Sequence, residues 1–398
     1  MKKRILKLII FSLFIIQITI ANNINIIAHG NNAFAIDLYK ELAKDPGNFF
    51  FSPYSISSAL AMTYAGARGD TAKQMEKVLY FTLSQDKLHP SFTKLNSLFN
   101  AKEKSYQLSI ANSLWGQKDY PFKKDFLSLV NKYYEAGFNE VNFVDDKERE
   151  EARQKINTWV EEKTNYKIKD LIQKTDLNSL TRLVLVNAIY FKGKWQNTFD
   201  PKETNEMPFY VNNTQKINTP IMHQEGNFNY TEDEDLQVLE IPYSGNELSM
   251  VILLPKTGIS LSEVERNLSI DKLNYLLSNL SPTKVDVYIP KFKLEKRFIL
   301  NEELIKLGMT DAFDEMLADF SGMTGDKDLY ISKVIHQSFI EVNEEGTEAA
   351  AATAVIMSGK SISLGPILFK ADRPFIFLIQ DKKTGTILFM GRFIEPTK

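Results

Sequence analysis

The stretch from Glu344 to Met357 constrains the fold of this chain more than any other part of its sequence. It contains four consecutive alanines, Ala349–Ala352, which favour a helix. The residues just before it, Phe339–Val342, show the alternation of side chains that is typical of a strand. This local sequence agrees with two interpretations. One is an alanine-rich surface helix followed by a loop, and the other is a strand that forms only under some conditions.

The same stretch has an unusual pattern when it is read with the two-residue period of a strand. One face carries small or uncharged side chains, and the other has a single charge, at Glu348. The uncharged face consists of Thr347, Ala349, Ala351, Thr353, Val355 and Met357. The segment could therefore enter a crowded sheet without burying a charge beyond its start. About ten new ladder hydrogen bonds at ~1 kcal/mol each would release on the order of 10 kcal/mol, comparable with the stability of a whole domain.

The composition is that of a globular protein and excludes several classes. Of the 398 residues, 43% are hydrophobic and 25% are charged, which rules out a disordered chain, a collagen and a polytopic membrane protein. The formal net charge of −2 argues against a general nucleic-acid binder. The chain has no cysteine, which excludes disulfides, thiolate metal sites and a cysteine nucleophile.

The N-terminus is typical of a secretory signal. Lys2–Arg4 is basic, Leu8–Ile16 is almost entirely apolar, and the small residues Thr19 and Ala21 suit cleavage after Ala21. A membrane anchor is disfavoured because the apolar run is shorter than the roughly 20 residues that span a bilayer. We therefore expect a signal peptide over residues 1–21, a single domain over residues 22–398, and export to the periplasm or the cell exterior. Four sequons, which matter only in a host that glycosylates, lie at Asn212, Asn229, Asn267 and Asn279.

The rest of the chain predicts one large α+β domain without a recognisable catalytic motif. Leu183–Phe191 is apolar on both faces and predicts a central strand, while Leu236–Leu254 and Phe375–Phe393 predict hairpins. No linker or repeat divides these elements. The four histidines lack metal-ligand spacing, and there is no nucleophile elbow, Walker loop or dinucleotide fingerprint. A dispersed hydrolase site is the remaining enzymatic alternative.

The sequence resembles the serpin family over essentially all of the expected mature chain. The resemblance rests on five segments in the family's order: 48–57, 187–201, 318–323, the hinge beginning at Gly346, and 369–377. It implies an α+β serpin fold with three β-sheets, about nine helices and an exposed reactive-centre loop at about 344–368. It also implies that a protease is acylated by this loop and is trapped when the cleaved loop inserts as a new strand. The implied hinge consists of Glu344, Gly346, Thr347, Glu348, Ala349, Ala350, Ala351, Ala352 and Thr353.

The resemblance also places the bond that the protease attacks. The scissile bond of the family follows the seventeenth residue counted from the position of Glu344, which gives Lys360–Ser361. Lys360 is the only basic residue between Glu344 and Phe369, and a trypsin-like specificity pocket requires such a side chain. We therefore expect a trypsin-like target. Cleavage after Met357 or Ile356 by a chymotrypsin- or elastase-like protease is the alternative.

Other residues match family positions next to the two strands of the main sheet that must separate when the cleaved loop inserts. Ser52, Ser55, Asn187 and His336 match the family's shutter, and Trp195 matches its breach; an ordinary core role would also account for each of them. The hinge has no proline or bulky residue from 347 to 354, which favours an inhibitor over a non-inhibitory carrier or chaperone.

We expect no cofactor and only a weak response to heparin. The segment 84–104, where some family members bind polyanions, carries four lysines beside Asp86 and Glu103. These lysines are Lys87, Lys94, Lys102 and Lys104. The expected partner is a trypsin-like serine protease in a covalent complex, with no nucleic acid and, after signal cleavage, no membrane. We expect a monomer in which an exposed strand donor makes polymerisation a hazard.

Overall fold

The structure is a computed structural model that describes residues 2–100, 104–134, 137–347 and 365–396. This part of the chain contains nine α-helices, as the resemblance implies, and two 3-10 helices. They are α1 (Lys2–Leu42), α2 (Pro53–Tyr64), α3 (Gly69–Leu79), α4 (Gln85–Phe99), α5 (Lys124–Tyr133), α6 (Asp146–Lys163), η1 (Pro201–Glu203), α7 (Leu261–Asn267), α8 (Ile270–Ser278), α9 (Asn301–Leu307) and η2 (Asp311–Phe313).

Fifteen strands accompany these helices in the described residues. They are β1 (Phe49–Phe51), β2 (Tyr106–Gln117), β3 (Phe138–Val141), β4 (Leu183–Lys194), β5 (Asn205–Tyr210), β6 (Lys216–Glu232), β7 (Leu236–Pro242), β8 (Leu248–Pro255), β9 (Ser281–Pro290), β10 (Phe292–Ile299), β11 (Lys333–Asn343), β12 (Gly346–Thr347), β13 (Ile367–Lys370), β14 (Phe375–Asp381) and β15 (Ile387–Phe393). The predicted central strand is β4, and the two predicted hairpins are β7–β8 and β14–β15.

The described strands form two hydrogen-bonded sheets, so the expected count of three is not met. One sheet has six strands in the order β10-β11-β12-β4-β2-β3, and the other has nine strands, β1-β15-β14-β8-β7-β6-β9-β13 with β5 on β6. The reason is the length of β6, which pairs first with β5, then with β9, and at its end with β7. One long strand thereby joins two sets of strands that would otherwise be separate sheets.

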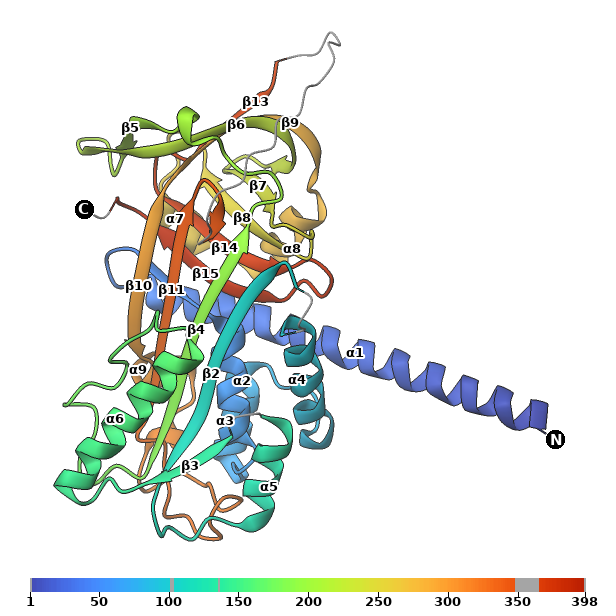
Figure 1. Ribbon diagram of the computed structural model, residues 1–398, viewed down its shortest axis with the longest axis vertical. Helices are drawn as coiled ribbons and strands as arrows, with labels where there is room; N and C mark the ends of the chain where they lie inside the picture. Colours follow the sequence, from blue (N-terminus) through green and yellow to red (C-terminus); the bar gives the residue numbers. More distant parts are fainter. Residues whose placement is uncertain (1, 101–103, 135–136, 348–364, 397–398) are drawn as a thin grey trace.

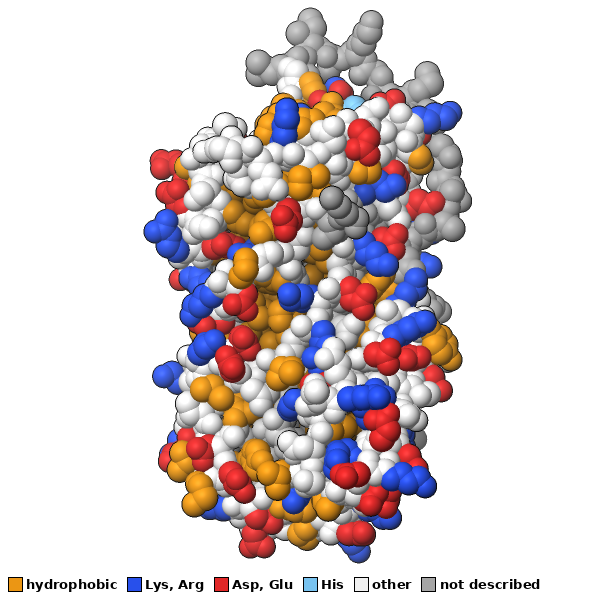
Figure 2. Space-filling view, turned by 90° about the vertical axis from the view of Figure 1, so that its left-hand side faces the viewer, with side chains coloured by type: hydrophobic (Ala, Val, Ile, Leu, Met, Phe, Trp, Pro, Cys, Tyr) orange, Lys and Arg blue, Asp and Glu red, His pale blue; other side chains and the backbone are white. Residues whose placement is uncertain are grey.

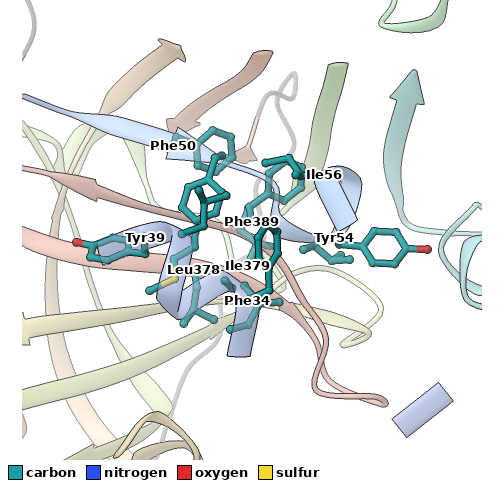
Figure 3. Close-up of a cluster of buried hydrophobic side chains, with 14 of the residues drawn as sticks. Phe34, Tyr39, Phe50, Tyr54, Ile56, Leu378, Ile379 and Phe389 are labelled. Carbon is teal, nitrogen blue, oxygen red and sulfur yellow. The ribbon is translucent and has the colours of Figure 1, made fainter. Parts of the chain in front are cut away.

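The main core lies between the two sheets and is organised around α2. This helix contacts β2, β4 and β15, and all of its residues are buried (Figure 1). It begins at Pro53 after Ser52, whose hydroxyl accepts a hydrogen bond from the Ser55 amide, so that both the cap and the first helical position are favourable. Figure 3 shows side chains of α1, α2, β1, β14 and β15 packed together there, among them Phe34, Tyr39, Phe50, Tyr54, Ile56, Leu378, Ile379 and Phe389.

A second apolar cluster lies between α6 and the outer face of the six-stranded sheet. Ile156 and Val160 of α6 pack with Val184 and Val186 of β4. The alternate β4 residues, such as Leu185, face the main core instead. Because β4 is covered on both faces, its sequence is apolar at nearly every position.

The first helix runs through the expected signal-peptide boundary. α1 is continuous from Lys2 to Leu42, so Ala21 lies inside a helix, and its first part projects away from the rest of the chain (Figure 1). α1 ends at Leu42, shortly before Asp45-Pro46-Gly47, a sequence that does not continue a helix. Among the described residues, no helix combines the length and the apolar character that crossing a membrane requires.

Candidate functional site: the parted strands β4 and β11

The central strands β4 and β11 are neighbours at one end and separated at the other. From Lys333 to Phe339, β11 pairs directly and in parallel with residues 184–190 of β4. Beyond that point the short strand β12 lies between them, and it pairs antiparallel with both. Thr347 is opposite Val342 of β11 on one side and Gly193 of β4 on the other. The first two residues of the predicted insertion, Gly346 and Thr347, therefore already occupy a strand position inside the sheet.

The position of Gly346 admits only glycine. Its φ angle is +150°, and a Cβ atom there would lie 2.1 Å from the carbonyl oxygen of Gly193. Any larger residue would push the backbone out of the gap between the strands. The glycine thus allows the chain to turn sharply after β11 and enter the sheet.

Thr347 is completely buried and is held by an aromatic residue that the sequence analysis does not identify. Its hydroxyl lies 2.8 Å from the Tyr243 hydroxyl, and the two share a hydrogen bond. The Tyr243 ring stacks on Trp195 with centroids 4.6 Å apart, and the Trp195 indole donates to the Asn343 carbonyl over 2.9 Å. Burial raises the pKa of Tyr243 well above its ordinary value, so its hydroxyl keeps its proton. Trp195 therefore lies at the point where β4 and β11 part.

Glu344 is anchored at the turn that leads into β12. Its carboxylate lies 2.9 Å from the Lys291 Nζ and accepts a hydrogen bond of 2.8 Å from the Thr204 hydroxyl. Burial opposes ionisation of this carboxyl, but the bonds from Lys291 and Thr204 outweigh it and hold its pKa below the ordinary value. The backbone of the same turn accepts hydrogen bonds from the amides of Trp195 and Phe199. Lys291 and Thr204 have no local sequence signal that marks them as partners of Glu344.

The four predicted shutter residues come together where β4 and β11 pair directly. The Ser52 amide donates to His336 Nε2 over 3.1 Å, and His336 Nδ1 bonds to Asn187 Oδ1 across the two strands. Asn187 Nδ2 donates to Ser55 Oγ over 2.6 Å and also contacts Asn112 of β2, which the sequence analysis missed. Burial lowers the pKa of His336 to about 3, so the ring is neutral and its Nδ1–H is the donor to Asn187.

Several predicted site residues lie outside the described part of the chain. They are the hinge residues Glu348–Thr353 and both residues of the expected reactive bond, Lys360 and Ser361. Lys102 of the segment examined for polyanion binding is also outside it, and Lys104 pairs with Glu247 at 2.5 Å. Lys87 and Lys94 are exposed on α4.

The six-stranded sheet therefore pairs β4 and β11 directly at one end and holds β12 between them at the other. The family model described as Serpin (serine protease inhibitor) matches residues 29–396, and the chain belongs to this family. It is accordingly a protein of the protease-inhibitor class and not an enzyme.

Individual relatives agree with this assignment. The chain is 45% identical over 372 residues to a leukocyte elastase inhibitor of Xenopus tropicalis, covering 91% of this chain and 97% of the relative. Among solved structures, Serpin48 of the insect Tenebrio molitor matches with a TM-score of 0.83 and 35% identity, over 93% of this chain and 98% of that one. Human thyroxine-binding globulin matches with a TM-score of 0.85 and 32% identity, over 94% and 100% of the two chains.

Proposed function

We propose that this chain is an exported suicide-substrate inhibitor of trypsin-like serine proteases that is cleaved at Lys360–Ser361. The observation that carries the proposal is the position of β12, whose two residues pair on both sides within the six-stranded sheet. The protease serine attacks the Lys360 carbonyl and becomes acylated, and Ser361 leaves with the new amino terminus. The freed segment then continues β12 into the sheet before the ester is hydrolysed.

The register of β12 predicts where the inserted residues would lie. In a strand that continued this register, Ala349 would come between Phe191 and Ile340, and Ala351 would come between Ile189 and Ser338. Phe191, Ile189 and Ile340 are already buried in the main core, so only small side chains would fit between them. This accounts for the alanine run without assuming a helix.

The same register relates the hinge to the shutter. Thr353 would arrive between Asn187 and His336, whose side chains now bond to each other. A threonine hydroxyl can both donate and accept, so it could satisfy these two groups after they separate. Met357 would come opposite Leu183, the first residue of β4, and Lys360 would lie three residues beyond the end of the strand. The inserted segment would thus fill the length of β4.

The residue that enters the protease pocket sets the specificity of the inhibitor. Lys360 favours a trypsin-like protease, because such a pocket selects a basic residue. The leukocyte elastase inhibitors among the relatives favour the second candidate, an elastase-like protease that cleaves near Met357 or Ile356. Both candidates use the same hinge and differ only in the residue that enters the protease pocket.

A carrier function receives some support from the likeness to thyroxine-binding globulin, whose name states that it binds thyroxine. Carrier sites for apolar ligands are enclosed and mostly apolar. The groove of about 520 Å³ beside Lys291 is open and has four charged residues in its lining. They are Lys291, Lys293, Glu295 and Glu341. This groove is a poor match for such a ligand, and the small hinge residues favour inhibition.

One experiment separates these functions. The chain without residues 1–21 is mixed with trypsin and, in parallel, with an elastase, followed by denaturing electrophoresis and mass spectrometry of the released C-terminal peptide. We expect a stable complex with trypsin and a peptide that begins at Ser361. A complex with elastase only, and a peptide that begins at Met357 or Ser358, would replace the trypsin-like assignment. Clean cleavage by both proteases without any complex would contradict inhibition.

Export is a separate part of the proposal. It rests on the basic and apolar N-terminal residues, and the family match begins only at residue 29. We expect the protein recovered outside the producing cell, or in its periplasm, to begin at Asn22. Protein that stays in the cytoplasm with Lys2–Ala21 attached would contradict export and leave the inhibitory mechanism untouched.

A further inference from the structure

The fold distinguishes sharply among the four Asn-x-Ser/Thr sequons. We propose that Asn212 is the N-glycan acceptor of this chain and that the other three sequons are silent in the folded protein. The inference rests on the proposed export, because N-glycans are added to chains that enter a secretory compartment. It concerns a side of the molecule that the inhibitory mechanism does not use.

Asn229 is excluded because its amide nitrogen is already engaged inside the fold. Asn229 lies on β6, where Nδ2 donates to the Glu240 carboxylate over 2.5 Å. Glu240 is only 4% exposed and also accepts a hydrogen bond of 2.7 Å from Ser249 Oγ. A sugar on Asn229 Nδ2 would need space beside the buried Glu240 carboxylate and would disrupt the hydrogen bonds that this carboxylate accepts.

The sequons of Asn267 and Asn279 lie at the two ends of α8, and each contributes a side chain to the capping of this helix. Asn279 follows α8, and its Nδ2 donates to the Tyr275 carbonyl over 2.7 Å, which closes the last turn. In the sequon of Asn267, the required hydroxyl belongs to Ser269, which caps the start of α8 by accepting from the Lys272 amide at 3.1 Å. Leu268, the middle residue of the sequon Asn267-Leu268-Ser269, is buried. Asn279 Nδ2 and the Ser269 hydroxyl could each take part in the reaction only by giving up a capping hydrogen bond at an end of α8.

Asn212 presents both groups on an exposed turn. It lies between β5 and β6, in the turn that projects from the upper part of the molecule (Figure 1). Its Oδ1 accepts hydrogen bonds of 2.9 Å from the Thr214 amide, the Thr214 hydroxyl and the Gln215 amide. Within the described residues, Asn212 Nδ2 makes no hydrogen bond, so all the internal bonds of this side chain go to its oxygen. The sequon hydroxyl is already beside the acceptor asparagine, and the nitrogen is left open to solvent.

The chemical step requires a lipid-pyrophosphate-linked oligosaccharide as the co-reactant. Asn212 Nδ2 forms a bond to the anomeric carbon of the first sugar, and the bond between that carbon and the pyrophosphate oxygen breaks. The lipid pyrophosphate leaves with the electron pair, and Nδ2 loses one proton. The hydrogen bonds to Asn212 Oδ1 can persist in the product, because the oxygen takes no part in the new bond.

The modified turn is not part of either described flank of the reactive segment. The described ends of that segment are β12, inside the six-stranded sheet, and β13, which pairs with β9. The Asn212 turn belongs to the β5–β6 hairpin instead. Among the described strands β5 pairs with β6, and its last residue, Tyr210, donates its amide to the Asp372 carbonyl just beyond β13. A glycan on Asn212 would shield the end of this hairpin while leaving the inhibitor active.

The test is glycan mapping of full-length protein secreted by cultured eukaryotic cells. The chain is expressed once with its own N-terminus and once with residues 1–21 replaced by an established signal sequence. Peptide N-glycosidase in heavy-oxygen water then marks each occupied asparagine by its conversion to labelled aspartate. We expect one glycan per chain, at residue 212. Secreted protein with no glycan, or with glycans at Asn229, Asn267 or Asn279 but not at Asn212, would overturn the proposal.

Matched variants in the same turn make the assignment specific. Asn212→Gln and Thr214→Ala should each remove the glycan, whereas Asn213→Gln keeps the sequon and should keep the glycan. All three should form the protease complex as the unchanged chain does, since the turn is remote from β12. The borrowed signal separates the two hypotheses: a glycan that appears only with that signal contradicts export by the native N-terminus but supports Asn212. Loss of the protease complex with intact glycosylation contradicts only the inhibitory function.

Discussion

The two ends of the seam between β4 and β11 differ in what holds them. At the lower end, which comprises Lys333–Phe339 of β11, the two strands pair directly through backbone hydrogen bonds. The hydrogen bond between His336 and Asn187 also joins their side chains there. At the upper end β12 separates the strands, and the contacts run instead from the hinge to the surrounding structure, through Tyr243 and Lys291. One end of the seam is therefore closed, and the other has already begun to accept a strand.

This difference indicates where the barrier to insertion lies. A further strand replaces one line of backbone hydrogen bonds by two, so the completed insertion gains bonds overall. The direct pairing at the lower end must first be broken, and the shutter network with it. In the proposed mechanism the closed end would therefore control the rate of insertion, and the open end would control whether insertion can start. Variants at the two ends should separate these effects.

The largest expected effect is at the open end. Thr347→Arg places a charge where the side chain is completely buried beside Tyr243, so the hinge cannot remain between the strands. We expect the variant to be cleaved as a substrate, with the ratio of complex to cleaved product lowered by at least about tenfold, or about 1.4 kcal/mol between the two outcomes. Denaturing electrophoresis after mixing with the target protease measures this ratio.

Thr347→Ser is the matched control for this variant. It keeps the hydroxyl that bonds to Tyr243 and loses one methyl group, so its complex ratio should stay close to that of the unchanged chain. If Thr347→Arg forms as much stable complex as Thr347→Ser, the hinge does not need to enter the sheet, and the mechanism proposed above is wrong.

A smaller effect is expected at the closed end. Asn187→Ala removes the amide that joins His336 to Ser55 and leaves buried polar groups unpaired, which should lower the free energy of unfolding by about 2–3 kcal/mol. Because this network crosses the seam, the variant should also take up a synthetic peptide with the sequence 348–357 several-fold faster. Denaturant unfolding and the kinetics of peptide uptake are the two measurements.

The control for Asn187→Ala is another buried asparagine away from the seam. Asn32 bonds to the backbone of Gly385 and Ile387 next to β15, so Asn32→Ala should be destabilised to a similar degree. Its rate of peptide uptake should remain unchanged. Equal acceleration in both variants would mean that general loosening, and not the shutter, sets the rate.

The ion pair of Glu344 and Lys291 predicts a pH dependence at the open end. The pKa of Glu344 is lower in the folded protein than in an unfolded chain, so the pair stabilises the fold at neutral pH. The contribution shrinks as the pH falls below about 4.3, the ordinary range of a glutamate, and is lost once the pH passes the folded pKa. Lys291→Met should cost about 1–2 kcal/mol at pH 7 and should reduce this acid-dependent part of the unfolding free energy.

Fluorescence of Trp195 reports this change locally, because its amide bonds to the Glu345 carbonyl in the same turn. Trp195→Phe assigns the signal, since Trp115 and Trp159 lie together near α6. An acid transition of the Trp195 signal that is identical in Lys291→Met and in the unchanged chain would show that another group controls the turn.

The elements that could be predicted from sequence are those whose burial is decided locally. Leu183–Phe191 predicts a strand covered on both faces, and β4 is buried between α6 and α2. The shutter residues were found through the family resemblance, and the structure brings all four together. The sheet count could not be predicted in this way, because it depends on where the long strand β6 changes partners.

The site residues that could not be predicted from the sequence are hydrogen-bond or ion-pair partners of predicted residues and do not belong to a recognisable motif. Tyr243, Lys291 and Asn112 each join a predicted site residue that is distant in the sequence. Asn112 has a local signal, a polar group within the strand-like run of β2, whereas Lys291 and Tyr243 lie just outside strands and have none. Such a polar group predicts that a partner exists, but its identity depends on which strands meet, and that is a property of the fold.

The smallest expected effect is that of heparin, which tests whether the inhibitor depends on an outside cofactor to open the seam. Lys87 and Lys94 are exposed on α4, but Lys104 is paired with Glu247. The face on the other side of the molecule from α4, shown in Figure 2, carries both signs of charge interspersed. We expect heparin to raise the rate of protease inhibition by less than about tenfold. Lys87→Ala combined with Lys94→Ala is the matched variant. A larger acceleration that this double variant abolishes would make α4 a polyanion site, whereas one that it retains would place the site elsewhere. Either result would mean that a polyanion controls the rate of protease inhibition in addition to the short hinge strand.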